Sequence, residues 1–87
     1  MTELESKVPV HTLPGLKRYI ENHIEPGGFL SAVLSNDLKE SFGRADQENR
    51  EHLFDIVNFL YNEAPATCWG SPEKVKAWLR ELYVDYS

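Results

Sequence analysis

Apolar residues recur at helical spacing in four segments of the chain, and the first segment begins near Thr12 or Leu13. Its apolar positions share one face of a helix because they follow one another at intervals of three or four residues. They are Leu13, Leu16, Ile20 and Ile24. Pro14 falls in the first turn, where a missing backbone N–H costs nothing. We therefore predict a helix here, ended by the run Glu25-Pro26-Gly27-Gly28.

The second segment, from about Gly28 to Phe42, carries a row of apolar residues spaced four positions apart. The row consists of Leu30, Leu34, Leu38 and Phe42. Gly43 follows at the position where a left-handed helix C-cap favours glycine. The pattern predicts one helix, but Ser35-Asn36-Asp37 is weak helix-forming sequence, and a break there is the alternative.

The third segment is apolar over most of its circumference. It begins near Asp46, a good N-cap with Glu48 in the first turn, and Pro65 stops it. Its apolar positions are Leu53, Phe54, Ile56, Val57, Phe59, Leu60 and Tyr61. So wide an apolar sector predicts either a central helix or a helix covered on its second side by a partner.

Ser71-Pro72-Glu73 is a strong start signal for a fourth helix, with Ser71 as N-cap and Pro72 next. Its apolar stripe is Val75, Trp78, Leu79 and Leu82. We expect residues 1–10 to be a flexible N-terminal lead and residues 83–87 to fray. The chain is thus predicted to be all-α, a compact bundle of about four helices with short loops. Residues 11–87 would form its single domain.

The acidic charge balance limits the classes of partner. The chain has 14 Asp and Glu against 9 Lys and Arg, a formal net charge of −5. This argues against nucleic acid as a partner, because phosphate binding relies on clustered Lys and Arg. An acidic surface suits either simple solubility or a basic protein partner. With no long apolar run and no signal peptide, we expect no membrane contact and a cytoplasmic location.

The chemically active residues predict no metal site and no catalytic site. The three histidines lack metal-site spacing, since Glu51-His52 has no HExxH context. Cys68, the one cysteine, precedes a helix start that could lower its pKa, but no local histidine would activate it. A tight turn explains Gly27-Gly28 better than an anion-binding loop does. We therefore expect no cofactor and no enzyme activity.

Two features are candidates for a binding site. Asp37 falls at the edge of the apolar face of the second helix, where a carboxylate needs a partner. It would either pair with an arginine of a neighbouring helix or form a polar pocket with Asn36, Asp46 and Asn49. Trp69, in a loop, would either cap the core or be exposed as an anchor, because aromatic residues concentrate binding energy at interfaces.

Three stretches carry a resemblance that covers roughly residues 11–80: PGGFLSAVLSNDL at 26–38, ADQEN at 45–49 and CWGSPE at 68–73. They resemble small hypothetical proteins encoded in tailed-bacteriophage genomes, a group without an assigned activity. The resemblance implies a setting, the cytoplasm of an infected bacterium, and it carries across no catalytic residue. Small phage proteins of this kind commonly bind host or phage proteins, counter host defences or assist replication.

The leading hypothesis is a non-enzymatic interaction protein that binds a host or phage protein. The apolar sector of the third helix and Trp69 would supply its binding face. A homodimer is a second possibility for so short a chain. The alternative is a protein that binds or sequesters a small, nucleotide-like ligand. It would use Asn36, Asp37, Asp46 and Asn49, in a pocket that a second subunit could complete.

Overall fold

The computed structural model describes the backbone of residues 3–84 and the side chains of residues 3–80. Within that range the chain forms seven α-helices, one short 3-10 turn (η1) and no strand. In chain order they are α1 (Glu3–Ser6), α2 (Leu13–Asn22), α3 (Gly28–Leu34), α4 (Leu38–Arg44), α5 (Gln47–Glu51), α6 (Leu53–Glu63), η1 (Ala66–Cys68) and α7 (Pro72–Val84). The all-α class is confirmed for this part of the chain. A bundle of about four helices is too coarse, because two of the expected helices are each divided.

The predicted second helix is two helices, α3 and α4. Asn36 adopts a left-handed conformation with a φ of 63°, which ends α3 and which asparagine tolerates better than most residues. Asp37 is then the N-cap of α4, since its carboxylate accepts a hydrogen bond from the backbone N–H of Glu40 at 3.1 Å. One helix over residues 28–42 is therefore wrong, and the break at residues 35–37 is confirmed. Gly43 lies inside α4 rather than capping it.

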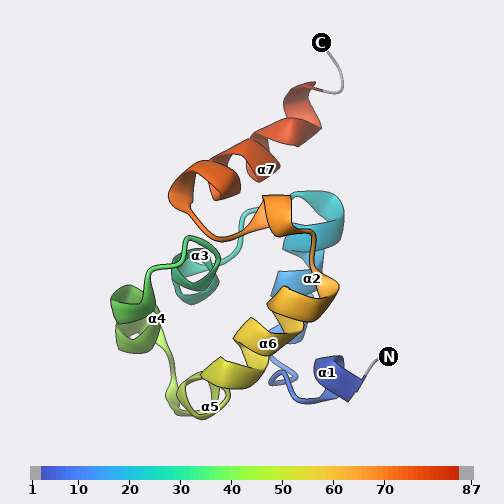
Figure 1. Cartoon of the computed structure of the whole chain (residues 1–87). Coiled ribbons are helices and arrows are strands. Elements are labelled where there is room, and N and C mark those ends of the chain that lie inside the picture. Colours follow the sequence, from blue (N-terminus) through green and yellow to red (C-terminus); the bar gives the residue numbers. More distant parts are fainter. Residues whose placement is uncertain (1–2, 85–87) are drawn as a thin grey trace.

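The predicted third helix is also divided. Asp46 is confirmed as an N-cap, because its carboxylate accepts a hydrogen bond from the backbone N–H of Asn49 at 2.8 Å. The helix that it starts, α5, ends at Glu51, and His52 separates it from α6. Figure 1 shows α5 turned away from the axis of α6, which crosses the middle of the molecule.

Residues 3–10, expected to be a flexible lead, take part in the fold. They include α1, and Val8 is 2% exposed within the core. Leu4 also packs against the core, and Glu5 forms an ion pair with Lys17 of α2. At the other end α7 continues to Val84, and the rest of the expected frayed tail lies outside the described residues.

The core forms where α2, α3, α6 and the loop before α7 meet. Its fully buried side chains include Leu16, Tyr19, Leu34, Ile56, Leu60 and Cys68. The Tyr19 hydroxyl donates to the Cys68 carbonyl at 2.6 Å, and the Trp78 indole N–H donates to the Tyr19 carbonyl at 2.8 Å. These two hydrogen bonds join α2 to η1 and to α7.

The expected apolar row on the second helix is buried along only half of its length. Leu30 and Leu34 are in the core, but Leu38 and Phe42 are 72% and 54% exposed. The physical reason is the break at Asn36, which interrupts the helical register that would have placed all four on one face. Leu38 and Phe42 are therefore exposed at the surface of the protein.

Candidate functional site

Helix α6 carries apolar side chains on two faces. Those packed in the core are Ile56, Phe59 and Leu60. On the other face Phe54 and Tyr61 are 79% and 80% exposed, and Val57 between them is 37% exposed. Their spacing of three and four residues places these three side chains in one line along the helix. A contiguous exposed apolar face is typical of interaction sites, which makes this face the candidate site.

Leu38 of α4 widens this exposed face. It lies beside Val57, because both line a small surface hollow of about 50 Å³. One turn further along α4 the ring of Phe42 is partly covered by the Arg50 guanidinium, 4.9 Å from the ring centroid. We use the name apolar surface for Leu38, Phe54, Val57 and Tyr61, of which Val57 is the least exposed.

A larger hollow, of about 520 Å³, lies at the end of the apolar surface where α6 gives way to η1. Its lining consists of Tyr61, Ala64, Ala66, Trp69, Gly70 and Lys74, and we call it the Trp69 hollow. Trp69 is half-buried, so it both packs against the core and lines the hollow. The backbone N–H of Gly70 donates to the Leu34 carbonyl at 2.7 Å, which ties this loop to α3.

Glycine is required at position 70. Its φ is 117°, a conformation that residues with a Cβ rarely adopt. A Cβ added there would be in ordinary van der Waals contact with the Lys74 side chain, 3.6 Å from Nζ. The Lys74 side chain therefore passes directly over Gly70, and its Nζ donates to the Ala66 carbonyl at 3.3 Å.

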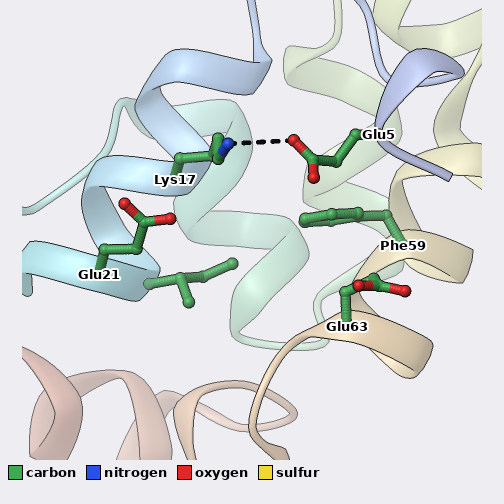
Figure 2. Close-up of a pocket in the computed structure, with 6 residues that line it drawn as sticks. Glu5, Lys17, Glu21, Phe59 and Glu63 are labelled. Atoms are coloured by element: carbon green, nitrogen blue, oxygen red, sulfur yellow. Dashed lines mark hydrogen bonds and ion pairs between the residues drawn. The ribbon is translucent and has the colours of Figure 1, made fainter. Parts of the chain in front are cut away.

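A separate hollow of about 180 Å³ is lined by residues of α1, α2 and α6 (Figure 2). Glu5 and Lys17 form an ion pair across it at 3.0 Å, and the hydrogen bond that Lys17 donates to the Glu5 carboxylate raises the pKa of Lys17. Figure 2 shows the Phe59 ring beside this pair, with Glu21 and Glu63 lining the rest of the hollow. Because its lysine is already paired, the hollow is best explained as the seam that holds α1 against α2.

Asn36 and Asp37 lie at the surface, in the break between α3 and α4, where they line the small hollow beside Leu38. The expectation that Asp37 is at a buried edge and pairs with an arginine is wrong. Its side chain is exposed and caps α4, while the nearby Arg44 pairs with Glu40 at 3.4 Å. The physical reason is that Asp37 starts a helix instead of lying within one.

Asp46 and Asn49 lie together at the start of α5, and neither lines the hollow of Asn36 and Asp37. The Asp46 carboxylate contacts His11 Nε2 at 2.9 Å. Asn49 is buried, and its side-chain oxygen accepts a hydrogen bond from the Thr12 hydroxyl at 2.5 Å. The four residues predicted to form one polar pocket thus lie in two separate places, and Asp46 and Asn49 fasten the N-terminal segment to α5.

The nucleophilic and basic side chains are held by structural contacts. Cys68 is buried, and burial raises the pKa of its thiol to about 11, so it stays protonated at neutral pH. His23 Nδ1 donates to the Trp78 carbonyl at 2.7 Å, and His52 Nδ1 lies 3.0 Å from the Asp55 carboxylate. Among the described residues no three His, Cys, Asp or Glu side chains are grouped to hold a metal ion.

The sequence pattern singled out the apolar sector of α6 and Trp69, but it missed Leu38 and Lys74. Leu38 continues a regular apolar row, which predicts a place on the packed face of a single helix. Lys74 belongs to α7 and meets Tyr61 of α6 only through the fold, so no local spacing could have paired them. A predicted helix break at Ser35-Asn36-Asp37 would also have predicted that Leu38 is exposed at the surface.

Comparisons with protein-family models, with curated proteins and with solved structures found no match for this chain. Between residues 3 and 84 no helix is both long enough and apolar enough to cross a membrane. The function therefore has to be argued from the surface itself.

Proposed function

We propose that the chain is a non-enzymatic protein-interaction module whose binding face is the apolar surface together with the Trp69 hollow. The observation that carries the proposal is the second apolar face of α6, where Phe54 and Tyr61 are about four-fifths exposed. Single exposed apolar residues are ordinary, but a line of them continued by a neighbouring helix is typical of an interaction site.

The chemistry of this face suits a protein partner. Two exposed aromatic rings supply anchors of the kind that dominate binding energy, and burying one such side chain contributes about 1.5–3 kcal/mol. The hollow beside Trp69 gives a partner side chain somewhere to insert. Most of the edge along α6 is polar, with Asn58 and Asn62 on the turns next to the aromatic line, as in the rim of an interface.

The setting of this proposal comes from the resemblance to small phage proteins. The chain would be made in the cytoplasm of an infected bacterium and would bind a host or phage protein there, in host takeover or anti-defence. Two observations support a role without enzyme activity. The Cys68 thiol is protonated at neutral pH, and each histidine side chain contacts a neighbouring group of the fold.

The alternative of a nucleotide-like ligand bound by Asn36, Asp37, Asp46 and Asn49 has less support. Asn36 and Asp37 line one hollow, whereas Asn49 lines another. Asn49 already uses its side-chain oxygen for Thr12, and Asp46 and Asp37 both cap helices. Side chains that hold the fold together in this way have less freedom to hold a ligand.

Affinity capture from bacterial lysate tests the proposal if it is done with matched surface variants. The test variant is Phe54→Ser with Tyr61→Ser. The control is Val10→Ser with Ile24→Ser, which removes two other exposed apolar side chains outside the apolar surface. All three proteins should melt alike, because substitutions at exposed sites usually change stability by less than about 0.5 kcal/mol.

The expected result is a stoichiometric partner that the original chain and the control both retain. The test variant should bind it at least about a hundredfold more weakly, since each lost anchor costs on the order of 2 kcal/mol. Retention of the same partner by the test variant would refute the assigned face. A capture that returns nothing would refute the interaction module.

A further inference from the structure

The Trp69 hollow has open aromatic walls. Tyr61 and Trp69 both line it, yet within the described residues the aromatic ring contact is between His23 and Trp78, elsewhere in the fold. No aromatic ring of the described residues is stacked on Tyr61 or Trp69, and Tyr61 is 80% exposed. The volume of about 520 Å³ falls in the range of about 300–1,000 Å³ that is common for small-molecule sites.

The polar groups around this hollow are mostly hydrogen-bond donors. The Lys74 ammonium has three N–H donors, of which one goes to the Ala66 carbonyl, and the Trp69 indole N–H is a donor only. Neither the Trp69 indole nor the Tyr61 hydroxyl bonds another described residue. In the core, by contrast, Trp78 and Tyr19 each have a partner for the same groups.

The hollow also carries a positive charge without a matching negative one. None of its six lining residues has a carboxylate, although the chain as a whole is acidic. Lys17 and Arg44 each pair with a glutamate, whereas the Lys74 ammonium is held by a neutral carbonyl. A complementary ligand must therefore supply acceptor oxygens with negative charge.

From these observations we propose that the Trp69 hollow binds a planar aromatic molecule that carries a carboxylate or a phosphate. Its ring would stack against Tyr61 and Trp69, and its anionic group would accept hydrogen bonds from Lys74. This site differs from the nucleotide-like pocket considered for Asn36, Asp37, Asp46 and Asn49. It also goes beyond the protein-interaction role, because a free small molecule would bind without any partner protein.

The test is a titration of the full chain followed by two-dimensional nitrogen–proton NMR, in which the two tryptophan indoles give separate signals. The probes are 2-naphthoate and adenosine monophosphate, each with its neutral counterpart, 2-naphthalenemethanol or adenosine. We expect both anions to move the Trp69 indole signal and to leave that of Trp78 in place. For ligands of this size the dissociation constant should be on the order of 1 mM. If only 2-naphthoate binds, the ligand is an aromatic carboxylate, and if only adenosine monophosphate binds, the ligand is an aromatic phosphate.

Lys74→Met is the test variant and Lys76→Met the matched control, since both lysines are exposed on α7 and only Lys74 lines the hollow. Lys74→Met should weaken anion binding about fivefold, and Lys76→Met should leave it unchanged. Equal binding of the neutral counterparts, or an unmoved Trp69 signal throughout, would overturn the proposal. The interaction face is tested by capture of a partner protein, whereas the hollow is tested by small molecules added to the chain alone, with Lys74→Met as its variant. The two proposals can therefore fail independently.

Discussion

Tyr19 is the residue on which three parts of the fold depend. Its side chain is fully buried in α2, its hydroxyl donates to the Cys68 carbonyl, and its own carbonyl accepts from Trp78. The apolar stripe of the sequence did not include it, because a tyrosine at that position is equally compatible with the polar side of a helix. The Tyr19 hydroxyl can be buried because it donates a hydrogen bond to the carbonyl of Cys68, which lies 49 residues away in the chain.

Tyr19→Phe should lower the free energy of unfolding by about 1–2 kcal/mol. The substitution keeps the ring but leaves the buried Cys68 carbonyl without its donor. Urea unfolding followed by circular dichroism measures the change. Tyr61→Phe removes a hydroxyl from an exposed ring and is the control, with almost no effect expected. Equal stability of Tyr19→Phe and the original chain would show that the hydrogen bond contributes nothing.

Cys68 should make the fold sensitive to alkaline pH. Burial raises the pKa of its thiol from 9.0 to about 11, so the unfolded chain loses this proton at a lower pH than the folded chain does. The contribution of Cys68 to stability should therefore be constant below about pH 9 and should fall as the pH rises from about 9 to about 11. Burial raises the pKa of Tyr19 as well, which adds a loss in the same direction above pH 10.

Urea unfolding at a series of pH values compares the original chain with Cys68→Ala. The variant should start less stable, because a small cavity is left, but its stability should fall less steeply through the alkaline range. Parallel curves for the two proteins would contradict a buried, protonated thiol.

At the scale of elements, the local signals in the sequence were sufficient wherever a capping side chain acts on its own backbone. Asp46 and Ser71 were both identified as N-caps, and both accept a hydrogen bond from the backbone N–H three residues on. The breaks at Asn36 and His52 are harder to predict. The apolar spacing around them is compatible both with one continuous helix and with two successive helices. The error at Asn36 then misplaced Leu38 and Asp37.

Asp37 should stabilise the protein through its cap rather than through burial. Asp37→Ala is expected to lower the free energy of unfolding by about 1 kcal/mol, because the backbone N–H of Glu40 loses its acceptor. Asp37→Ser should recover most of the loss, since a serine hydroxyl can accept the same hydrogen bond. A loss of several kcal/mol in both variants would point to a buried charge instead, and thermal unfolding distinguishes the two outcomes.

At the scale of the whole molecule, the apolar residues of α6 divide between the core and the surface. The sequence showed that α6 had more apolar residues than one face needs, but it left open whether the fold or a partner covers the rest. The described fold buries Ile56, Phe59 and Leu60 and leaves Phe54 and Tyr61 exposed. The four polar residues predicted to share a pocket lie in two separate places within the described chain, because local spacing does not encode the arrangement of the helices.

The most direct test of the account is hydroxyl-radical footprinting of the captured complex, because it reads the exposure of individual side chains. Phe54 and Tyr61 should be labelled strongly in the free chain and much less in the complex, while labelling of Val10 and Ile24 stays the same. That result would place the partner on the apolar surface. Unchanged labelling of Phe54 and Tyr61 in a complex that is otherwise intact would contradict it and would move the binding site to another face.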